Sequence, residues 1–219
     1  MKQPHLNNLK SRYIFGDQDA LLVVDVQNSF IPGGKLAVSG GDKIIPLINE
    51  IASKFANVIL TQDWHPIEHI SFAANHSGKV PFESIQLPYG QQTLWPVHCV
   101  QGTEDAAIAS ELKISHTQLI IRKGFHKEID SYSAFLEANQ ETETGLAGYL
   151  NSRGIKNLYV CGLATDFCVA WTALDAINFG FNTFVIEDAT KAIDLNGSLA
   201  TAWNNMLAAG VHRVQSSQL

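Results

Sequence analysis

The chain has 219 residues, of which 46% are hydrophobic and 16% are charged, and its formal net charge at pH 7 is −6. This composition is ordinary for a folded globular protein, and the negative charge argues against a nucleic-acid partner, which requires a basic face. The sequence contains no run of 18 or more apolar residues, so we expect neither a transmembrane helix nor a membrane partner.

The N-terminus and the cysteines bear on where the protein works. Residues 1–19 are polar, with scattered basic side chains and no apolar segment, and we expect an N-terminal extension there rather than a signal peptide. Three cysteines are an odd number and too few for a disulfide scaffold, which favours a reducing compartment. We therefore expect a cytoplasmic protein. The sequence leaves the oligomeric state open, a homo-oligomer included.

Residues 20–26 form an apolar run that only Asp25 interrupts. Such a run is typical of a strand that is buried on both faces of a parallel sheet. Because an ionised aspartate is rarely buried without a partner, we expect Asp25 near the carboxyl end of this strand and paired with another group. The alternative is a structural aspartate that caps the following loop.

Strand and helix patterns alternate along the rest of the chain, which predicts one α/β domain over residues 20–219 with a mainly parallel sheet. The long segment 66–102 has no period of its own, and loops of this length in compact domains are usually functional. Pro46 is expected in the first turn of the first helix, and Gly154 and Gly180 just after two others. Further strands are predicted at 57–60, 118–122, 158–161, 183–186 and 211–214, and helices at 44–56, 104–112, 145–153, 167–179 and 198–209.

A strand, a turn and a helix in the last third of the chain carry the strongest candidate for chemistry. The turn starts at Gly162 and the helix pattern at about Phe167, which places Cys168 at a helix start. Backbone N–H groups there lack intrahelical partners and the helix dipole favours an anion, so both are expected to lower the pKa of Cys168. We therefore predict that Cys168 is a thiolate nucleophile. Cys161, inside the apolar strand, and Cys99, in a loop, are interpreted as structural.

Reactive side chains follow four consecutive strands of the predicted sheet. Asp25, Asp63 and Lys123 each come near the carboxyl end of a strand, and so does the turn 162–168. Ligands bind beyond the carboxyl ends of the strands in an open parallel sheet, so these groups are expected on one rim. Asp25 could take the proton of Cys168, while the ammonium of Lys123 would favour the thiolate. The alternative for Lys123 is an ordinary surface lysine.

Asp63 and His65 form an Asp-x-His pair. A carboxylate and an imidazole are good ligands for a divalent metal, and this spacing lets both chelate from one side of an extended chain. The pair alone is a weak signal, because histidines are often merely packed or exposed. Three protein ligands would leave open positions for catalysis or substrate binding. His69, His76 and His98 are the candidates for the third ligand, and the spacing does not choose among them.

Five short motifs run in order along the chain. They are Asp25-Val26-Gln27-Asn28, Asp63-Trp64-His65-Pro66, residues 95–102, Lys123-Gly124 and residues 162–169. This set resembles that of the nicotinamidases, which belong to the isochorismatase-like cysteine hydrolases. The resemblance covers residues 20–215 and implies a single-domain, three-layer α/β/α fold with a six-stranded, mainly parallel sheet.

The resemblance also implies roles for residues around the nucleophile. It implies a catalytic triad of Asp25, Lys123 and Cys168. It implies an oxyanion hole formed by the backbone N–H groups of Ala164 and Cys168, with a cis peptide bond between Leu163 and Ala164. A strained bond of this kind costs about 3–4 kcal/mol and persists only in a well-determined turn.

For the metal, the resemblance implies the ligands Asp63, His65 and His98 and keeps His69 in reserve. It implies one divalent ion, with Zn²⁺ as the first choice and Mn²⁺ or Fe²⁺ as alternatives that suit the same ligands. One departure is Ser29, where the family often has aspartate; we expect it to affect only the local loop. The aromatic walls of the substrate slot are implied to be Phe30, Trp95 and Tyr132.

The implied activity is hydrolysis of nicotinamide to nicotinate and ammonia through a thioester, a step of NAD salvage, with pyrazinamide as a further substrate. A related hydrolase acting on another small amide is the nearest alternative. Isochorismate cleavage is disfavoured, because that branch typically lacks the nucleophilic cysteine. A nucleotide- or flavin-binding module would want a Gly-x-Gly-x-x-Gly or Walker-type loop, and a redox protein a Cys-x-x-Cys pair; the sequence contains none of these.

Overall fold

The computed structural model describes residues 14–219, so residues 1–13 of the expected N-terminal extension lie outside the described part. Within it, six strands form one parallel sheet in the order β5-β2-β1-β6-β7-β8. The predicted α/β class with a mainly parallel sheet is confirmed. The strands are β1 (Asp19–Val24), β2 (Asn57–Asp63), β5 (Leu119–Lys123), β6 (Asn157–Leu163), β7 (Asn182–Lys191) and β8 (His212–Val214).

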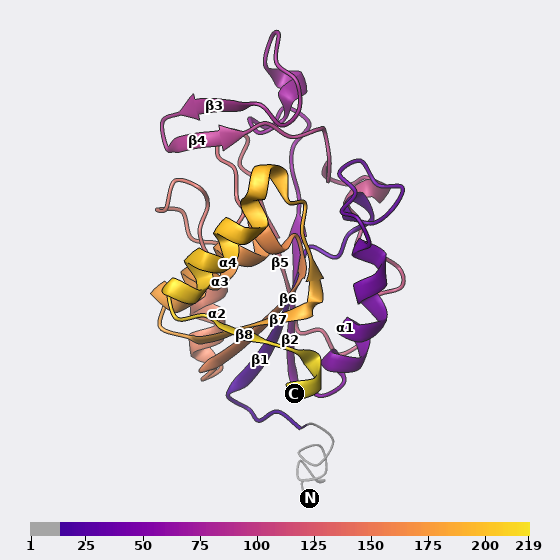
Figure 1. Cartoon of the computed structure of the whole chain (residues 1–219), viewed down its shortest axis with the longest axis vertical. Coiled ribbons are helices and arrows are strands. Elements are labelled where there is room, and N and C mark those ends of the chain that lie inside the picture. Colours follow the sequence, from indigo (N-terminus) through magenta and orange to yellow (C-terminus); the bar gives the residue numbers. More distant parts are fainter. Residues whose placement is uncertain (1–13) are drawn as a thin grey trace, which may run out of the picture.

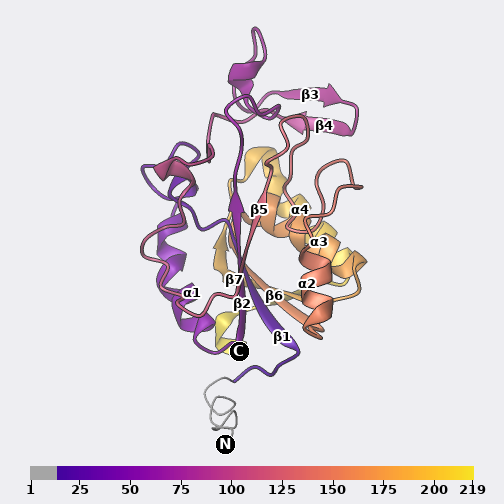
Figure 2. The same ribbon diagram turned by 180° about the vertical axis from the view of Figure 1, so that it is seen from behind.

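Helices cover both faces of this sheet (Figures 1 and 2). One face carries α1 (Ile45–Ala52), and the other carries α2 (Leu146–Ser152), α3 (Ala170–Asn178) and α4 (Ser198–Ala208). Alternate residues of β1 divide between the two cores: Leu22 packs on the α2–α4 side, and Leu21 and Val23 pack on the α1 side. Because both faces are covered, successive positions of the strand must all be apolar, which explains the unbroken run before Asp25. None of the helices in the described part is long and apolar enough to cross a bilayer.

The segment between β2 and β5 forms a cap over one end of the sheet. It contains β3 (Ser84–Leu87) and β4 (Gly90–Thr93), which form a separate two-stranded antiparallel sheet. This hairpin lies beyond the carboxyl ends of the strands, at the opposite end of the molecule from the C-terminus (Figure 1). The sequence did not predict it, because four-residue strands rich in glutamine carry no clear hydrophobic alternation.

The helix predicted at 104–112 is wrong. The structure has a single 3₁₀ turn at Glu104–Ala106, and the backbone is already extended at Ala107. The N–H of Ala109 then donates to the carbonyl of Val26 at 2.9 Å, so this segment makes its backbone hydrogen bond with the loop after β1. Long-range pairing has overridden a weak local helix preference.

Candidate active site

Four reactive side chains meet beyond the carboxyl ends of β1, β2, β5 and β6, as the sequence predicted. Lys123 lies between two carboxylates: its Nζ is 2.8 Å from Asp25 Oδ2, and it also pairs with Asp63. The same Nζ is 3.3 Å from the Sγ of Cys168. All four side chains are buried, and both Asp25 and Lys123 are 0% exposed. The alternative of a surface lysine at position 123 is therefore wrong.

The ends of the strands explain this meeting. In the parallel ladder between β2 and β5, Asp63 and Lys123 are direct neighbours. Asp25 follows β1 with a φ of 46°, a left-handed conformation that an aspartate adopts only rarely. Thr61 on β2 holds it there, because its hydroxyl donates to Asp25 Oδ1 at 2.6 Å and accepts from the Asp25 N–H at 3.0 Å. No pattern in the sequence indicated this role for Thr61.

Burial and the neighbouring charges set the protonation of this cluster. Burial raises the pKa of Asp25 and so does Asp63, while Lys123 opposes both effects. Burial lowers the pKa of Lys123, but the charges of Asp25 and Asp63 overcome this and hold it well above its usual value. The ammonium of Lys123 is therefore kept, and it compensates two buried carboxylates.

The expectation that Cys168 has a lowered pKa is wrong. Burial raises the pKa of its thiol well above the usual value; Lys123 lowers it, and the charges of Asp25 and Asp63 raise it further. Cys168 does lie near a helix start, in a helical turn over Thr165–Val169 that leads into α3 at Ala170, but burial outweighs any effect of that start on its pKa. Burial and the two carboxylates thus favour the thiol form of Cys168 over the thiolate.

The turn that carries Cys168 differs from the simple helix start that the pattern predicted. The peptide bond between Leu163 and Ala164 is cis, as the resemblance implied. Residues Thr165–Val169 then form a π-helical turn, closed by a 3.1 Å hydrogen bond from the Val169 N–H to the Ala164 carbonyl. Gly162, with a φ of 112°, passes so close to β1 that a Cβ there would lie 2.1 Å from the Val24 carbonyl oxygen. Only glycine fits that position.

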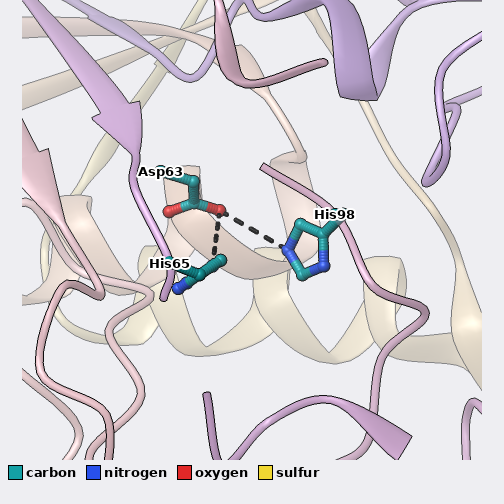
Figure 3. Close-up of side chains that lie close together, drawn as sticks. All are labelled: Asp63, His65 and His98. Atoms are coloured by element: carbon teal, nitrogen blue, oxygen red, sulfur yellow. Dashed lines mark ion pairs between the residues drawn. The ribbon is translucent and has the colours of Figure 1, made fainter. Parts of the chain in front are cut away.

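Asp63, His65 and His98 converge on one point (Figure 3). Asp63 Oδ2 lies 3.6 Å from His65 Nε2 and 3.8 Å from His98 Nε2. The other ring nitrogen of each histidine donates to a backbone carbonyl, of Gly124 at 2.7 Å and of Pro96 at 2.8 Å. Although burial raises the pKa of Asp63, Lys123 and hydrogen bonds from both histidines hold it well below its usual value.

This donor set fits a divalent metal. An ionised carboxylate and two imidazoles are suitable ligands, and metal-binding histidines characteristically donate their second ring nitrogen to a carbonyl or carboxylate. Gly124 makes that support possible for His65: it has a φ of 66°, and a Cβ at this position would lie 2.3 Å from the His65 ring. Position 124 must therefore be glycine, because any side chain there would collide with the His65 ring that the Gly124 carbonyl holds.

The other two histidines considered from the sequence lie elsewhere. His69 has its Nδ1 within 2.7 Å of the Ser71 hydroxyl and its Nε2 3.2 Å from the Ile129 carbonyl. Burial lowers the pKa of His69 to about 4, so it is neutral. His69 can still form a second group of ligand atoms with His65 and Asp130. His76 is bonded through Nε2 to the Ile70 carbonyl at 2.7 Å.

A narrow cavity of about 30 Å³ opens beside Cys168 and the two histidines of the cluster. The three aromatic residues expected as slot walls, Phe30, Trp95 and Tyr132, all line it. The Trp95 indole N–H donates to the Tyr132 hydroxyl at 3.0 Å, which fixes the two rings against each other. Wall residues that the sequence did not identify are Leu36, Asp130, Ser131, Phe167 and Ile193.

Gln27 is a further residue whose role the sequence did not reveal, although it lies in the first motif. Its buried amide donates to the Asp63 carbonyl at 2.9 Å and to the Ala106 carbonyl at 2.8 Å, and its oxygen accepts from the Asp63 N–H at 2.8 Å. Gln27 therefore fixes the backbone of Asp63. Its place in the first motif, two residues after Asp25, was the signal that pointed to it.

The sequence profile of the isochorismatase domain family matches residues 19–218. The chain belongs to the isochorismatase family. Among the family's members, a nicotinamidase of Acinetobacter baylyi is 62% identical over 200 residues, which cover 91% of this chain and 94% of that protein. The resemblance that the five motifs indicated is confirmed.

Solved structures of isochorismatase-family proteins agree with this fold. A nicotinamidase/pyrazinamidase of Acinetobacter baumanii has a TM-score of 0.92 and 64% identity, covering 93% of this chain and 98% of that one. A pyrazinamidase of Pyrococcus horikoshii in complex with zinc has a TM-score of 0.75 and 37% identity, covering 90% of this chain and 99% of that one. The predicted three-layer α/β/α fold is confirmed.

Proposed function

We propose that this chain is an amide hydrolase that converts nicotinamide and water to nicotinate and ammonia, and that it also hydrolyses pyrazinamide. The observation that carries this proposal is one narrow, aromatic-lined cavity that is bordered by the thiol of Cys168 and by the Asp63–His65–His98 cluster. The close likeness to nicotinamidases of two Acinetobacter species supports it. The three free cysteines support the expected reducing compartment.

Substrate binding uses the aromatic walls. The flat pyridine ring lies between Phe30 and Trp95, with Tyr132 at its edge, and its carboxamide faces Cys168. Such a site holds a reacting carbon and a nucleophile in one geometry, which removes much of the entropic cost of bringing them together.

The first half of the reaction forms a thioester. Asp25 accepts the proton of the Cys168 thiol, and Sγ attacks the amide carbon; the carbonyl π bond opens to give an oxyanion. The backbone N–H groups of Ala164 and Cys168 hold this oxyanion, a contribution typically worth about 3 kcal/mol per donor. Lys123 keeps its charge beside both Asp25 and Sγ, so it stabilises the thiolate as it forms.

The second half releases the products. Asp25 gives its proton to the amide nitrogen, the C–N bond breaks, and ammonia leaves the acylated cysteine. Water then attacks the thioester while Asp25 accepts one of its protons, the C–S bond breaks, and nicotinate departs as the thiol of Cys168 is restored. Each proton that Asp25 takes is returned, so one carboxylate serves as base and acid in turn.

Asp63, His65 and His98 are proposed to hold one divalent ion. When bound, such an ion supplies a Lewis-acid contact that orients the ring nitrogen of the substrate. Zinc is the first choice, supported by the zinc complex of the Pyrococcus horikoshii relative, and Mn²⁺ and Fe²⁺ suit the same ligands.

The metal proposal predicts that the purified protein carries about one divalent ion per chain, and that His98→Ala loses it because only two ligands remain. Elemental analysis by mass spectrometry measures the content directly. His76→Ala is the matched control, since His76 bonds a backbone carbonyl away from the cluster, and it should keep the ion. Full metal content in His98→Ala would reject His98 as a ligand.

Ammonia release from a panel of small amides tests the function. Nicotinamide and pyrazinamide should both be hydrolysed, with nicotinate and pyrazinoate as the acid products. Benzamide, which lacks the ring nitrogen, should react at least about 100-fold more slowly, because it loses the contact that orients the ring. Rapid turnover of a different small amide with none of nicotinamide would favour the related-hydrolase alternative instead.

A further inference from the structure

We propose that Gln92, on the β3–β4 hairpin, is a positioning residue that holds one wall of the substrate slot in place through Tyr132 and Asp130. This inference rests on the proposed function, because it concerns the slot in which the amide substrate binds. Gln92 belongs to a segment in which the sequence predicted no regular structure, and the motifs and mechanism do not use it.

The Gln92 side chain is an almost fully buried amide, only 1% exposed. Its Nε2 lies 2.6 Å from Asp130 Oδ2, 2.7 Å from the Thr93 carbonyl and 3.2 Å from the Tyr132 hydroxyl. Its Oε1 accepts from the Tyr89 hydroxyl at 3.1 Å. The preceding residue on the same strand, Gln91, is exposed, because successive side chains of a strand point to opposite faces.

The neighbours of Gln92 determine which way its amide points. The Asp130 carboxylate and the Thr93 carbonyl can only accept hydrogen bonds, so the NH₂ group must face them. The carbonyl end is left for the Tyr89 hydroxyl, which donates to it. An amide is the one side-chain group of this shape that offers donors on one side and an acceptor on the other. A carboxylate in its place would stand directly against Asp130.

The partners of Gln92 are walls of the slot. Asp130 and Tyr132 both line the cavity beside Cys168. The Tyr132 hydroxyl accepts from the Trp95 indole at 3.0 Å and lies 3.2 Å from the Gln92 amide nitrogen, whose two hydrogens are shared among Asp130, the Thr93 carbonyl and this hydroxyl. These donors come from β4 and from the chain just after it, so this part of the cap holds the tyrosine at one end of its ring. The Tyr132 ring in turn lies 5.8 Å from that of Phe167, in the turn of the nucleophile.

The β3–β4 hairpin can position Tyr132 only if it is itself held against the rest of the fold. It forms its own two-stranded sheet, and an isolated pair of strands is marginally stable in water. It lies beyond the carboxyl ends of the main sheet (Figure 2). Gln92 joins it to the segment after β5, which carries Asp130 and Tyr132. In a cavity of about 30 Å³, a small shift of Tyr132 changes the space that the substrate ring can occupy.

The test compares three variants by steady-state kinetics with nicotinamide. Gln92→Leu keeps the approximate volume and removes every hydrogen bond, and it should raise KM about tenfold while kcat changes less than about threefold. Gln92→Glu keeps the shape and places a carboxylate against Asp130, so it should raise KM at least as much. Gln91→Leu, on the exposed face of the same strand, should keep the KM of the wild type.

One further measurement, together with the KM of Gln92→Glu, separates this role from a purely structural one. The rate at which iodoacetamide alkylates Cys168 should stay near the wild-type value in Gln92→Leu, because the nucleophile is untouched. A residue that only filled space would tolerate Gln92→Glu, so a wild-type KM in that variant overturns the inference. A wild-type KM in Gln92→Leu, or a loss confined to kcat, overturns it as well.

The outcomes also separate this inference from the function on which it rests. If the wild-type enzyme hydrolyses nicotinamide and both Gln92 variants keep its KM, the inference alone fails. If the wild-type enzyme neither hydrolyses nor binds nicotinamide, the proposed function fails and the inference fails with it. Binding is measured by calorimetric titration of nicotinamide into Cys168→Ala, with and without Gln92→Leu, which needs no turnover and should show the same tenfold weakening.

Discussion

Replacing Cys168 with alanine is expected to abolish ammonia release from nicotinamide, with kcat reduced by at least about 10⁴-fold. The proposed reaction passes through a bond between Sγ and the amide carbon, and alanine has no atom that can form it. Lys123 and Asp25 remain in place around the gap but have no thiol to activate. Ammonia release in a continuous assay, with the variant at high concentration, measures the residual rate.

Cys161→Ala is the matched control for this loss. Cys161 is also buried, but it lies within β6, packs in the core on the α1 side and does not line the cavity. Both changes remove one buried sulfur, so their effects on the free energy of unfolding should be similar, roughly 1 kcal/mol each. Only Cys168→Ala should lose activity. Turnover in Cys168→Ala above one hundredth of the wild-type rate would contradict the thioester mechanism.

The residues at the carboxyl ends of the strands could be predicted from the sequence, because the strands of a parallel sheet are buried on both faces. A strand covered on both faces reads as an unbroken apolar run, so the first polar residue after it marks its carboxyl end. Asp25 is placed in this way, Asp63 and Lys123 lie just beyond the ends of their predicted strands, and in the structure Lys123 pairs with both carboxylates. The resemblance then chose His98 among three histidines, a choice that spacing alone could not make.

The rest depended on contacts between distant parts of the chain. The helix expected at 104–112 is replaced by pairing with the loop after β1, and the expected low pKa of Cys168 is reversed by burial. Thr61 and Gln92 act through partners 36 to 40 residues away, which no local pattern shows. Local propensity predicts the helices and strands. The roles of these residues depend on contacts between elements that are far apart in the sequence.

The raised pKa values of Cys168 and Asp25 belong to one arrangement. Burial raises both, so neither group is ionised as readily as in water. Lys123 is the charge that limits this rise, since it opposes burial at both groups. The lysine therefore tunes the base and the nucleophile together.

Lys123→Met is expected to lower both stability and activity. Methionine has a similar length but no charge, so Asp25 and Asp63 are left facing each other without a cation. Breaking a buried ion pair by removing one partner costs about 3–5 kcal/mol in the free energy of unfolding. The pKa of Asp25, already raised by burial, should rise further, so a larger share of Asp25 is protonated and less of it can accept the proton of Cys168. Urea unfolding measures the loss of stability. A chelator is added so that no metal ion compensates the charge of Asp63.

Two comparisons separate stability from catalysis in this result. Lys79→Met removes an exposed lysine that pairs with Glu83 at 3.4 Å, and it should change the free energy of unfolding by less than about 0.5 kcal/mol. The double variant Asp25→Asn/Lys123→Met removes one of the two uncompensated carboxylates, so it should regain part of the lost stability while remaining inactive. If Lys123→Met unfolds at the wild-type urea concentration, the two carboxylates do not depend on the lysine charge. If it also keeps its turnover, Lys123 has no part in activating Cys168.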